Sequence, residues 1–279
     1  MAVDLHLHSQ FSDGSNWPAD IVETAISRGL TTIALTDHDV FEGITVAREA
    51  AGGRIGFIPG VELSIEWEGR GVHLLGYWID AGSDLDRELE AIRSSREERN
   101  EKIVATLNDL GLPITVAEVQ RISGPGVIGR PHIALALIDH GVVQTVSEAF
   151  DRYLSKGRPA YHDRLRLTLD RALDLIHDAG GVASIAHPHT IADEEGDFRD
   201  SVERLAELGV DGVECWYSEY PEDQRRTMAA WVDRLGLVPT GGSDHHGDSK
   251  PGIEIGVGRG DLRVPDEVVE RLSERRREV

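Results

Sequence analysis

Six apolar stretches of the chain run into His, Asp or Glu, and this pattern most constrains the fold. The stretches cover residues 3–8, 33–39, 57–62, 72–75, 182–189 and 238–246. Short apolar runs rich in Val and Ile are typical of buried strands. Barrels and sheets of parallel strands collect their functional groups at the carboxyl ends of the strands. The pattern therefore predicts one shared site for polyvalent metal ions and a metal-dependent hydrolase.

Strand and helix patterns alternate along most of the chain, which predicts an α/β protein with a parallel sheet or barrel. We expect strands over 2–8, 31–36, 55–63, 72–77, 182–187, 210–216 and 237–241, with a hairpin return through Gly69 between 55–63 and 72–77. The middle of the chain has a different pattern, because no predicted strand between His73 and His187 ends in candidate metal ligands. We interpret residues 96–160 as a small, mostly helical insertion between two parts of a barrel, 1–95 and 161–279.

The balance of charge restricts the partners. The chain has 50 acidic residues against 29 basic ones and a formal charge of −21. Such a chain offers no broad basic surface for duplex DNA. An anionic substrate would need a local positive charge, which metal ions can supply. The single cysteine, Cys215, allows no intrachain disulfide. We expect a cytoplasmic protein without a signal peptide or a membrane span.

The candidate ligands differ in how strongly the sequence alone supports them. His6 and His8 are two apart on a strand and face one side, so they can hold one ion, although two core histidines would show the same spacing. Asp13 precedes Gly14, a pair more typical of a turn. Glu62 suits either a salt-bridged acid or a carboxylate that bridges two ions. His187 lies nearest to its strand and is a better candidate ligand than His189.

Two further motifs concentrate polar residues directly after a strand. Thr36-Asp37-His38-Asp39 follows an apolar run, and Ser243-Asp244-His245-His246 lies in a glycine-rich turn. So many polar groups at the end of a buried strand indicate ligands or catalytic residues.

Five of these motifs together resemble the PHP (polymerase and histidinol phosphatase) family of metal-dependent phosphoesterases. The matching segments are 4–9, 36–39, 60–62, 186–188 and 242–246, and the resemblance extends from residue 2 to about residue 260. It implies a distorted (β/α)7 barrel with a trinuclear metal centre that hydrolyses phosphate esters.

The resemblance implies a ligand set for three ions. The first ion takes His6, His8, Glu62 and Asp244; the second takes Glu62, His73 and His187; the third takes Asp13, His38 and His246. Glu62 would serve two ions and support catalysis directly. Nitrogen and oxygen donors without thiolate suit Mn, Fe or Zn, of which we favour Mn. Three divalent ions would outweigh the charge of the three carboxylates and make the site locally positive.

The insertion contains Gly129-Arg130-Pro131-His132, which resembles one subgroup of the family. That subgroup acts on 3',5'-bisphosphorylated nucleotides and on the 5' ends of short RNA. The resemblance implies that Arg130 holds a phosphate and that His132 binds phosphate or protonates the leaving oxygen. The alternative is an ordinary helix start with a surface arginine.

Several other polar residues receive weaker interpretations. Arg93, Arg96 and Arg99 recur at helical spacing among acidic neighbours, which favours a solvated face over contact with RNA. Further groups are expected to orient the ligands by hydrogen bonds or to reach the site, and these are Asp37, Asp39, His189, His245 and Glu214. The histidines expected to be structural or exposed are His140, His162 and His177.

The leading prediction of function is a phosphoesterase that acts on a nucleotide or a short RNA end. Histidinol-phosphate phosphatase and hydrolysis of a cyclic nucleotide are alternatives within the family. A non-catalytic metal-binding domain is an alternative from another class, which the complete ligand set disfavours.

Overall fold

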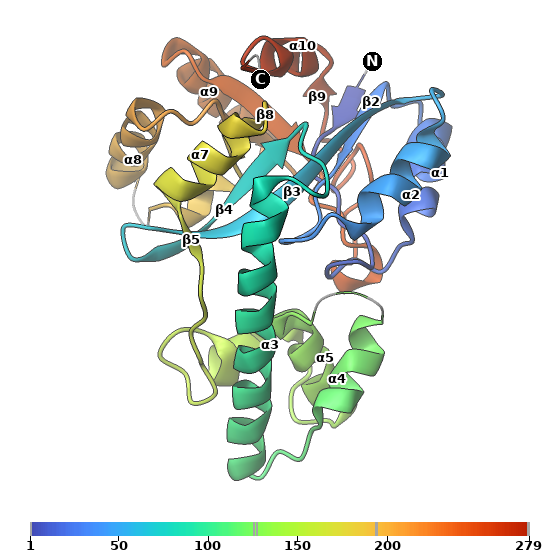
Figure 1. The fold of residues 1–279 in the computed structure, drawn as a ribbon, viewed down its shortest axis with the longest axis vertical. Helices are drawn as coiled ribbons and strands as arrows, with labels where there is room; N and C mark the ends of the chain where they lie inside the picture. The colour runs from blue at the N-terminus through green and yellow to red at the C-terminus, as the bar shows by residue number, and fades with distance from the viewer. Residues whose placement is uncertain (1, 125, 127, 193–194, 278–279) are drawn as a thin grey trace.

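A computed structural model describes residues 2–124, 126, 128–192 and 195–277 (Figure 1). Its strands form one sheet in the order β8-β7-β6-β4-β3-β2-β1-β9, and β5 pairs with β3. The strands are β1 (Ala2–Asp4), β2 (Thr32–Leu35), β3 (Gly56–Trp67), β4 (Arg70–Tyr77), β5 (Leu167–Thr168), β6 (Val182–Ile185), β7 (Gly212–Tyr217), β8 (Val238–Gly242) and β9 (Val264–Pro265). The α-helices are α1 (Pro18–Ser27), α2 (Glu42–Ala51), α3 (Asp84–Asp109), α4 (Val116–Ser123), α5 (Arg130–Asp139), α6 (Val146–Ala149), α7 (Leu169–Asp178), α8 (Glu195–Glu207), α9 (Glu222–Arg234) and α10 (Glu267–Ser273).

Hydrogen bonds between β8 and the segment after β1 curve this sheet into a nearly closed barrel. The Leu5 amide donates to the Gly241 carbonyl at 3.2 Å, and the Asp244 amide donates to the His6 carbonyl at 2.9 Å. The two segments approach so closely that a Cβ on Gly242 would lie 2.4 Å from the His6 nitrogen. Only glycine fits this contact. The predicted α/β barrel is confirmed.

The barrel is not wholly parallel, and the hairpin return predicted through Gly69 is present. β4 runs antiparallel to both β3 and β6, whereas β1–β2, β2–β3, β6–β7 and β7–β8 are parallel pairs. A tight hairpin at Glu68 and Gly69, both with positive φ, reverses the chain between β3 and β4. β9 and α10 after residue 260 lie beyond the predicted elements.

The helices of the barrel cover its outside with apolar faces (Figure 1). α1 begins with Pro18 at its first position, where a missing N–H costs nothing, and buries Ile21, Val22 and Ala25. α7 begins after Thr168, whose hydroxyl accepts from the Arg171 amide. Because helices pack on the outside, the strand ends are left free to carry the polar site.

α3 is a 26-residue helix that leads away from the barrel to a second group of helices (Figure 1). These helices have their own apolar cluster, formed by Ile103, Leu107, Val119, Ile133, Leu137, Leu154 and their neighbours. α3 continues without a break through residues 95 and 96, and the second cluster begins at Ile103. The division of the chain into domains stays a prediction. No helix among the described residues is both long and apolar enough to cross a bilayer.

Candidate metal centre

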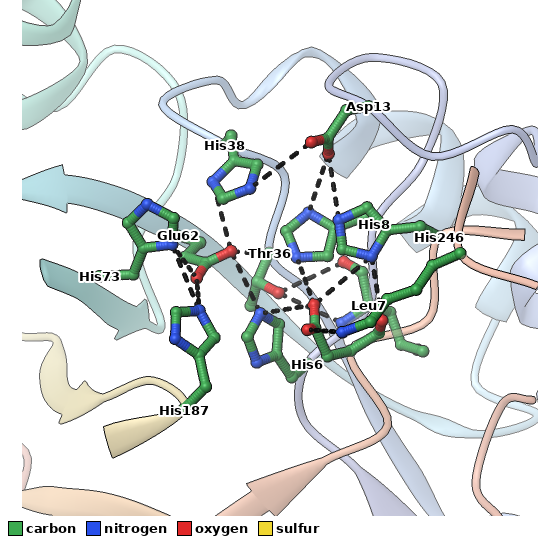
Figure 2. A network of polar contacts seen from close by, with 12 residues as sticks. His6, Leu7, His8, Asp13, Thr36, His38, Glu62, His73, His187 and His246 are labelled. Atoms are coloured by element: carbon green, nitrogen blue, oxygen red, sulfur yellow. Dashed lines mark hydrogen bonds and ion pairs between the residues drawn. The ribbon is translucent and has the colours of Figure 1, made fainter. Parts of the chain in front are cut away.

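The residues predicted as ligands converge at one end of the barrel, where their imidazoles and carboxylates point toward one another (Figure 2). Glu62 and His73 lie within β3 and β4, and the other ligand candidates lie in the segments that follow β1, β2, β6 and β8. The set is His6, His8, Asp13, His38, Glu62, His73, His187, Asp244 and His246. Segments that are far apart in the chain thus supply one cluster, as the strand-end pattern predicts.

Glu62 lies in the middle of this cluster and is almost completely buried, with 1% of its surface exposed. Its Oε1 atom is 2.9 Å from both His73 Nδ1 and His187 Nε2. Its Oε2 atom lies 3.1–3.2 Å from nitrogen atoms of three further imidazoles, those of His6, His8 and His38. Each carboxylate oxygen therefore faces a different group of histidines, which is the arrangement that a bridging ligand requires.

Two further carboxylates lie on the other side of His8. Asp13 Oδ1 is 3.2 Å from His246 Nε2, and Asp13 Oδ2 is 3.8 Å from His38 Nε2. Asp244 Oδ1 is 3.4 Å from His8 Nε2. Asp244 and His187 both have positive φ, 57° and 27°, and such backbone strain in non-glycine residues concentrates at functional sites.

Orphaned polar atoms show that the cluster suits metal ions. His8 Nε2, Asp13 Oδ1 and His38 Nδ1 are buried, and none of them makes a hydrogen bond within the described part of the chain. Buried polar atoms normally have a partner. Three groups of residues offer donor atoms within 4.8 Å of one another, namely His8, Asp13, His38 and His246; His6, His8 and Asp244; and His38, Glu62 and His73. The cluster is able to bind divalent metal ions.

The protonation of the cluster also indicates a need for positive charge. Burial alone would raise the pKa of the Glu62 carboxyl, but the imidazoles of His38 and His6 hold it well below its usual value. Burial works against the charged imidazole of His8, yet the adjacent carboxylates of Asp244 and Glu62 raise its pKa to about 10. The buried carboxylates thus stay ionised and favour protonated His6 and His8, whereas burial lowers the pKa of His38 to about 3. Metal ions can take the place of these protons.

Glu214, only a weak candidate from sequence, lies directly behind the cluster and is fully buried. Its Oε1 atom is 2.9 Å from His6 Nδ1, and its Oε2 atom accepts from the His187 amide at 2.6 Å. A carboxylate on one ring nitrogen fixes the tautomer and leaves His6 Nε2 free to face Glu62 and Asp244.

We expect Glu214→Gln to lower metal affinity by roughly tenfold to a hundredfold, as is usual when the partner of a ligating histidine is changed. Titration of metal-free protein with Mn²⁺, followed by calorimetry, measures the effect. Glu219→Gln, on a partly exposed residue after the same strand, is the matched control. Equal affinities of wild type and Glu214→Gln would exclude this positioning role.

Four residues expected to orient ligands bind other partners. The carboxylate of Asp37 accepts from Ser9 and Ser12 and holds the loop after β1. The Asp39 carboxylate accepts from the Ser64 amide and from arginines. His189 bonds to Tyr220, and His245 bonds to Asn16 and to the Ile253 carbonyl. These four residues lie near the site, as their closeness to the ligand candidates in the sequence predicts. The direction of each side chain depends on the local backbone, which the sequence does not reveal.

Tyr217 and Lys250 were not singled out in the sequence. The Tyr217 hydroxyl and the Lys250 ammonium donate to Asp244 Oδ2 at 2.9 and 2.8 Å. Both therefore help to orient Asp244. An isolated tyrosine or lysine far along the chain carries no sequence signal for such a contact.

The solvated face predicted for the arginines of α3 is wrong for Arg96 and Arg99. They are 6% and 5% exposed, whereas Arg93 is half-buried and donates to the Asp39 carbonyl at 3.1 Å. The neighbouring acids Glu97, Glu98 and Glu101 do lie exposed on the opposite face. Residues far along the chain, including Arg164, cover the arginine face of the helix, and spacing within α3 could not reveal this.

A cavity of about 250 Å³ joins these arginines to the ligand cluster. Its lining includes the ligand candidates Asp13, His38 and His73 and the cations Arg96, Arg99, Arg130 and Arg164. Burial and the neighbouring arginines lower the pKa of Arg99 to about 8 and that of Arg164 to about 9. Such crowding of positive charge favours binding of an anion. We call this cavity the arginine pocket.

The helix start predicted at Gly129–His132 is present as the first turn of α5. The Arg130 guanidinium donates to the Leu154 carbonyl at 3.1 Å and lies 5.4 Å from the centre of the Phe150 ring. The Gly129 amide donates to His132 Nδ1 at 3.0 Å. Burial lowers the pKa of His132. A neutral imidazole that accepts at Nδ1 carries its proton on Nε2, which remains a possible donor.

The remaining histidines have structural surroundings. His177 is buried and bonds to Asp211 at 2.9 Å, His162 bonds to the Thr106 hydroxyl at 2.7 Å, and His140 lies 3.3 Å from Glu118.

A family model of the PHP domain matches residues 4–212, which include seven of the nine ligand candidates. The chain belongs to the PHP domain family. The resemblance seen in the sequence is thus confirmed.

Similar proteins cover almost all of the chain. It is 35% identical over 261 residues to a 3',5'-nucleoside bisphosphate phosphatase from Chromobacterium violaceum, covering 91% of this chain and 90% of that one. It is 34% identical to a 5'-3' exoribonuclease from Haemophilus influenzae, with coverage of 87% and 89%. A crystal structure from Bifidobacterium adolescentis, assigned as a metal-dependent phosphoesterase, superposes with a TM-score of 0.84 at 29% identity, covering 99% and 97%. The predicted enzyme class, a metal-dependent phosphoric ester hydrolase, is confirmed.

Proposed function

We propose that this PHP protein hydrolyses phosphate esters of nucleotides, as a 3'-phosphatase of 3',5'-bisphosphonucleotides, a 5'-3' exonuclease on short RNA, or both. The observation that carries the proposal is the arginine pocket, because it opens onto Asp13, His38 and His73 of the ligand cluster. A substrate held there has one phosphate at the cluster and a second anionic group among the arginines. The names of the relatives from C. violaceum and H. influenzae are consistent with such substrates.

We assign the nine ligand candidates to three divalent ions, with Mn²⁺ favoured. His6, His8, Glu62 and Asp244 would hold the first; Glu62, His73 and His187 the second; Asp13, His38 and His246 the third. When bound, such ions activate water for attack and neutralise the charge of the phosphoryl oxygens. Glu62 supports this assignment because its two oxygens face two different sets of imidazoles.

The arginines act on the substrate itself. Arg130 stands at the start of α5, with its guanidinium also 5.9 Å from the Tyr161 ring, so its direction is fixed by stacking. Arg96 and Arg164 share the Asp39 carboxylate, and Arg96 Nε has no hydrogen-bond partner within the described residues. A planar guanidinium with free donors suits a phosphate group. His132 would donate from Nε2 to a substrate oxygen or to the leaving oxygen.

The arginine pocket also separates this function from its alternatives. Histidinol phosphate carries an ammonium group beside its single phosphate, and buried arginines would repel that cation. A cyclic nucleotide has a single phosphodiester and would leave the arginines without an anion. A non-catalytic domain has no use for a preformed anion site beside the metal ligands.

A substrate series tests the proposal. We expect the kcat/KM of Mn²⁺-loaded protein to be at least about tenfold higher for adenosine 3',5'-bisphosphate and 5'-phosphorylated short RNA than for AMP, cyclic AMP or histidinol phosphate. Removal of metal with EDTA should abolish turnover, and Mn²⁺ should restore it. Metal analysis should approach three ions per chain. Preference for a substrate with a single phosphate would overturn the nucleotide assignment, and one ion or fewer would overturn the trinuclear one.

A further inference from the structure

A second, larger cavity lies beside the ligand cluster, where its lining residue His189 neighbours the ligand candidate His187. It has a volume of about 540 Å³ and lies between α8 and α9, with His189, Phe198, Tyr220, Gln224, Thr227 and Trp231 among its lining residues. The two cavities share no lining residue. We call this cavity the aromatic groove.

A row of aromatic rings connects the lining of the groove to the ligand cluster. The rings of His187 and His189 have centroids 5.9 Å apart, and His189 in turn lies 5.8 Å from Tyr220. The Tyr220 hydroxyl accepts from the His189 amide at 3.0 Å, which fixes the inner end of the groove. A group bound beside Tyr220 would therefore be close to a phosphate at His187.

The chemistry of the groove differs from that of the arginine pocket. Phe198 and Trp231 pack with ring centroids 5.8 Å apart, and Met228 supplies an apolar floor. The charged lining residues are of both signs, Arg199 and Asp223, so the groove offers no excess of positive charge for a phosphate. The Gln224 amide can donate and accept hydrogen bonds, and the Thr227 hydroxyl, which donates to the Asp223 carbonyl at 2.8 Å, can still accept one.

We propose that the aromatic groove binds the nucleoside that follows the scissile phosphate in a short RNA chain, with its base against the aromatic side chains. Bases stack on aromatic residues irrespective of sequence, and their edges need polar partners such as Gln224 and Thr227. The inference rests on the proposed function and deepens it. In a simple bisphosphate nothing follows the phosphate at the metal centre, so the groove has an occupant only when that phosphate is a diester.

The geometry thus assigns an order of subsites along the substrate. The 5'-phosphate lies in the arginine pocket, the scissile diester at the ligand cluster and the next nucleoside in the groove. Hydrolysis breaks one P–O bond of the diester; water supplies the hydroxyl that stays on phosphorus and the proton that the leaving oxygen receives. An enzyme with an occupied groove prefers an RNA end over a free nucleotide bisphosphate.

A pair of matched substrates tests the groove without changing the phosphates. One is the dinucleotide pApA, and the other carries an abasic residue in place of the second adenosine. We expect wild-type kcat/KM to be roughly fivefold to a hundredfold higher for pApA than for the abasic analogue, which is the usual contribution of one stacked base. In Trp231→Ala and Gln224→Ala the ratio of the two rates should fall toward one. Leu208→Ala, an exposed apolar residue after α8 and outside the groove, should keep the wild-type ratio.

A binding measurement on metal-free protein keeps the two proposals separable. Adenosine should quench the tryptophan fluorescence of wild type and should quench that of Trp231→Phe much less. Circular dichroism shows whether both proteins are folded. Quenching without hydrolysis of any phosphate ester would support the groove and refute the proposed function. Hydrolysis with equal rates on pApA and its abasic analogue would refute the groove alone.

Discussion

Replacement of Glu62 by Gln is expected to lower turnover at least a thousandfold, the largest effect of any single change considered. Glu62 is buried among five imidazoles and faces them with both oxygens. An amide has one neutral acceptor oxygen and cannot bridge two cations, so metal-assisted attack on phosphorus is lost. A thousandfold loss corresponds to about 4 kcal/mol of barrier. Steady-state hydrolysis of adenosine 3',5'-bisphosphate measures it.

The control for this prediction lies on the same strand. Glu66 is exposed, four residues along β3 from Glu62, and Glu66→Gln should keep wild-type turnover and metal content. Glu62→Gln should also bind fewer ions per chain, as measured by metal analysis after gel filtration. Wild-type turnover in Glu62→Gln would remove the residue from the catalytic centre.

Replacement of Arg130 by Ala is expected to lower kcat/KM by roughly tenfold to 150-fold, which corresponds to the loss of about 1.5–3 kcal/mol of charged hydrogen bonding. Arg130 lines the arginine pocket but makes no contact with a ligand candidate among its described hydrogen bonds. Metal content should therefore stay unchanged. The loss should be larger for bisphosphates than for monophosphates, because only bisphosphates place a second, non-reacting phosphate beside the guanidinium.

The matched control is Arg121→Ala, which removes an exposed arginine from α4 of the same helical region. It should leave kinetics on every substrate unchanged. An equal loss on mono- and bisphosphates in Arg130→Ala would place Arg130 at the reacting phosphate. Unchanged kinetics would make it a surface residue and would weaken the nucleotide assignment.

Much of this protein could be predicted because chemistry-bearing residues follow strands directly. The alternation of strands and helices predicts the barrel, and parallel strands bring their carboxyl ends together. His6, His8 and Asp244 could therefore be grouped without coordinates, although Asp244 is more than 230 positions from the two histidines. The hairpin from β3 to β4 also followed from the sequence, whereas the antiparallel pairing of β4 with β6 did not, since an apolar run does not encode the direction of the strand beside it.

The sequence by itself determined the type of fold, the family and the candidate ligands, since these depend on local periodicity and on short motifs at strand ends. Tertiary structure decided everything that depends on which surfaces meet. Arg96 and Arg99 change from a solvated face to the wall of a pocket because Arg164, 65 residues beyond Arg99, folds back over α3. Glu214 becomes the support of His6 because β7 lies beside β8, which closes against the segment after β1. Burial and charge at such contacts are properties of the assembled chain, and no window of sequence contains them.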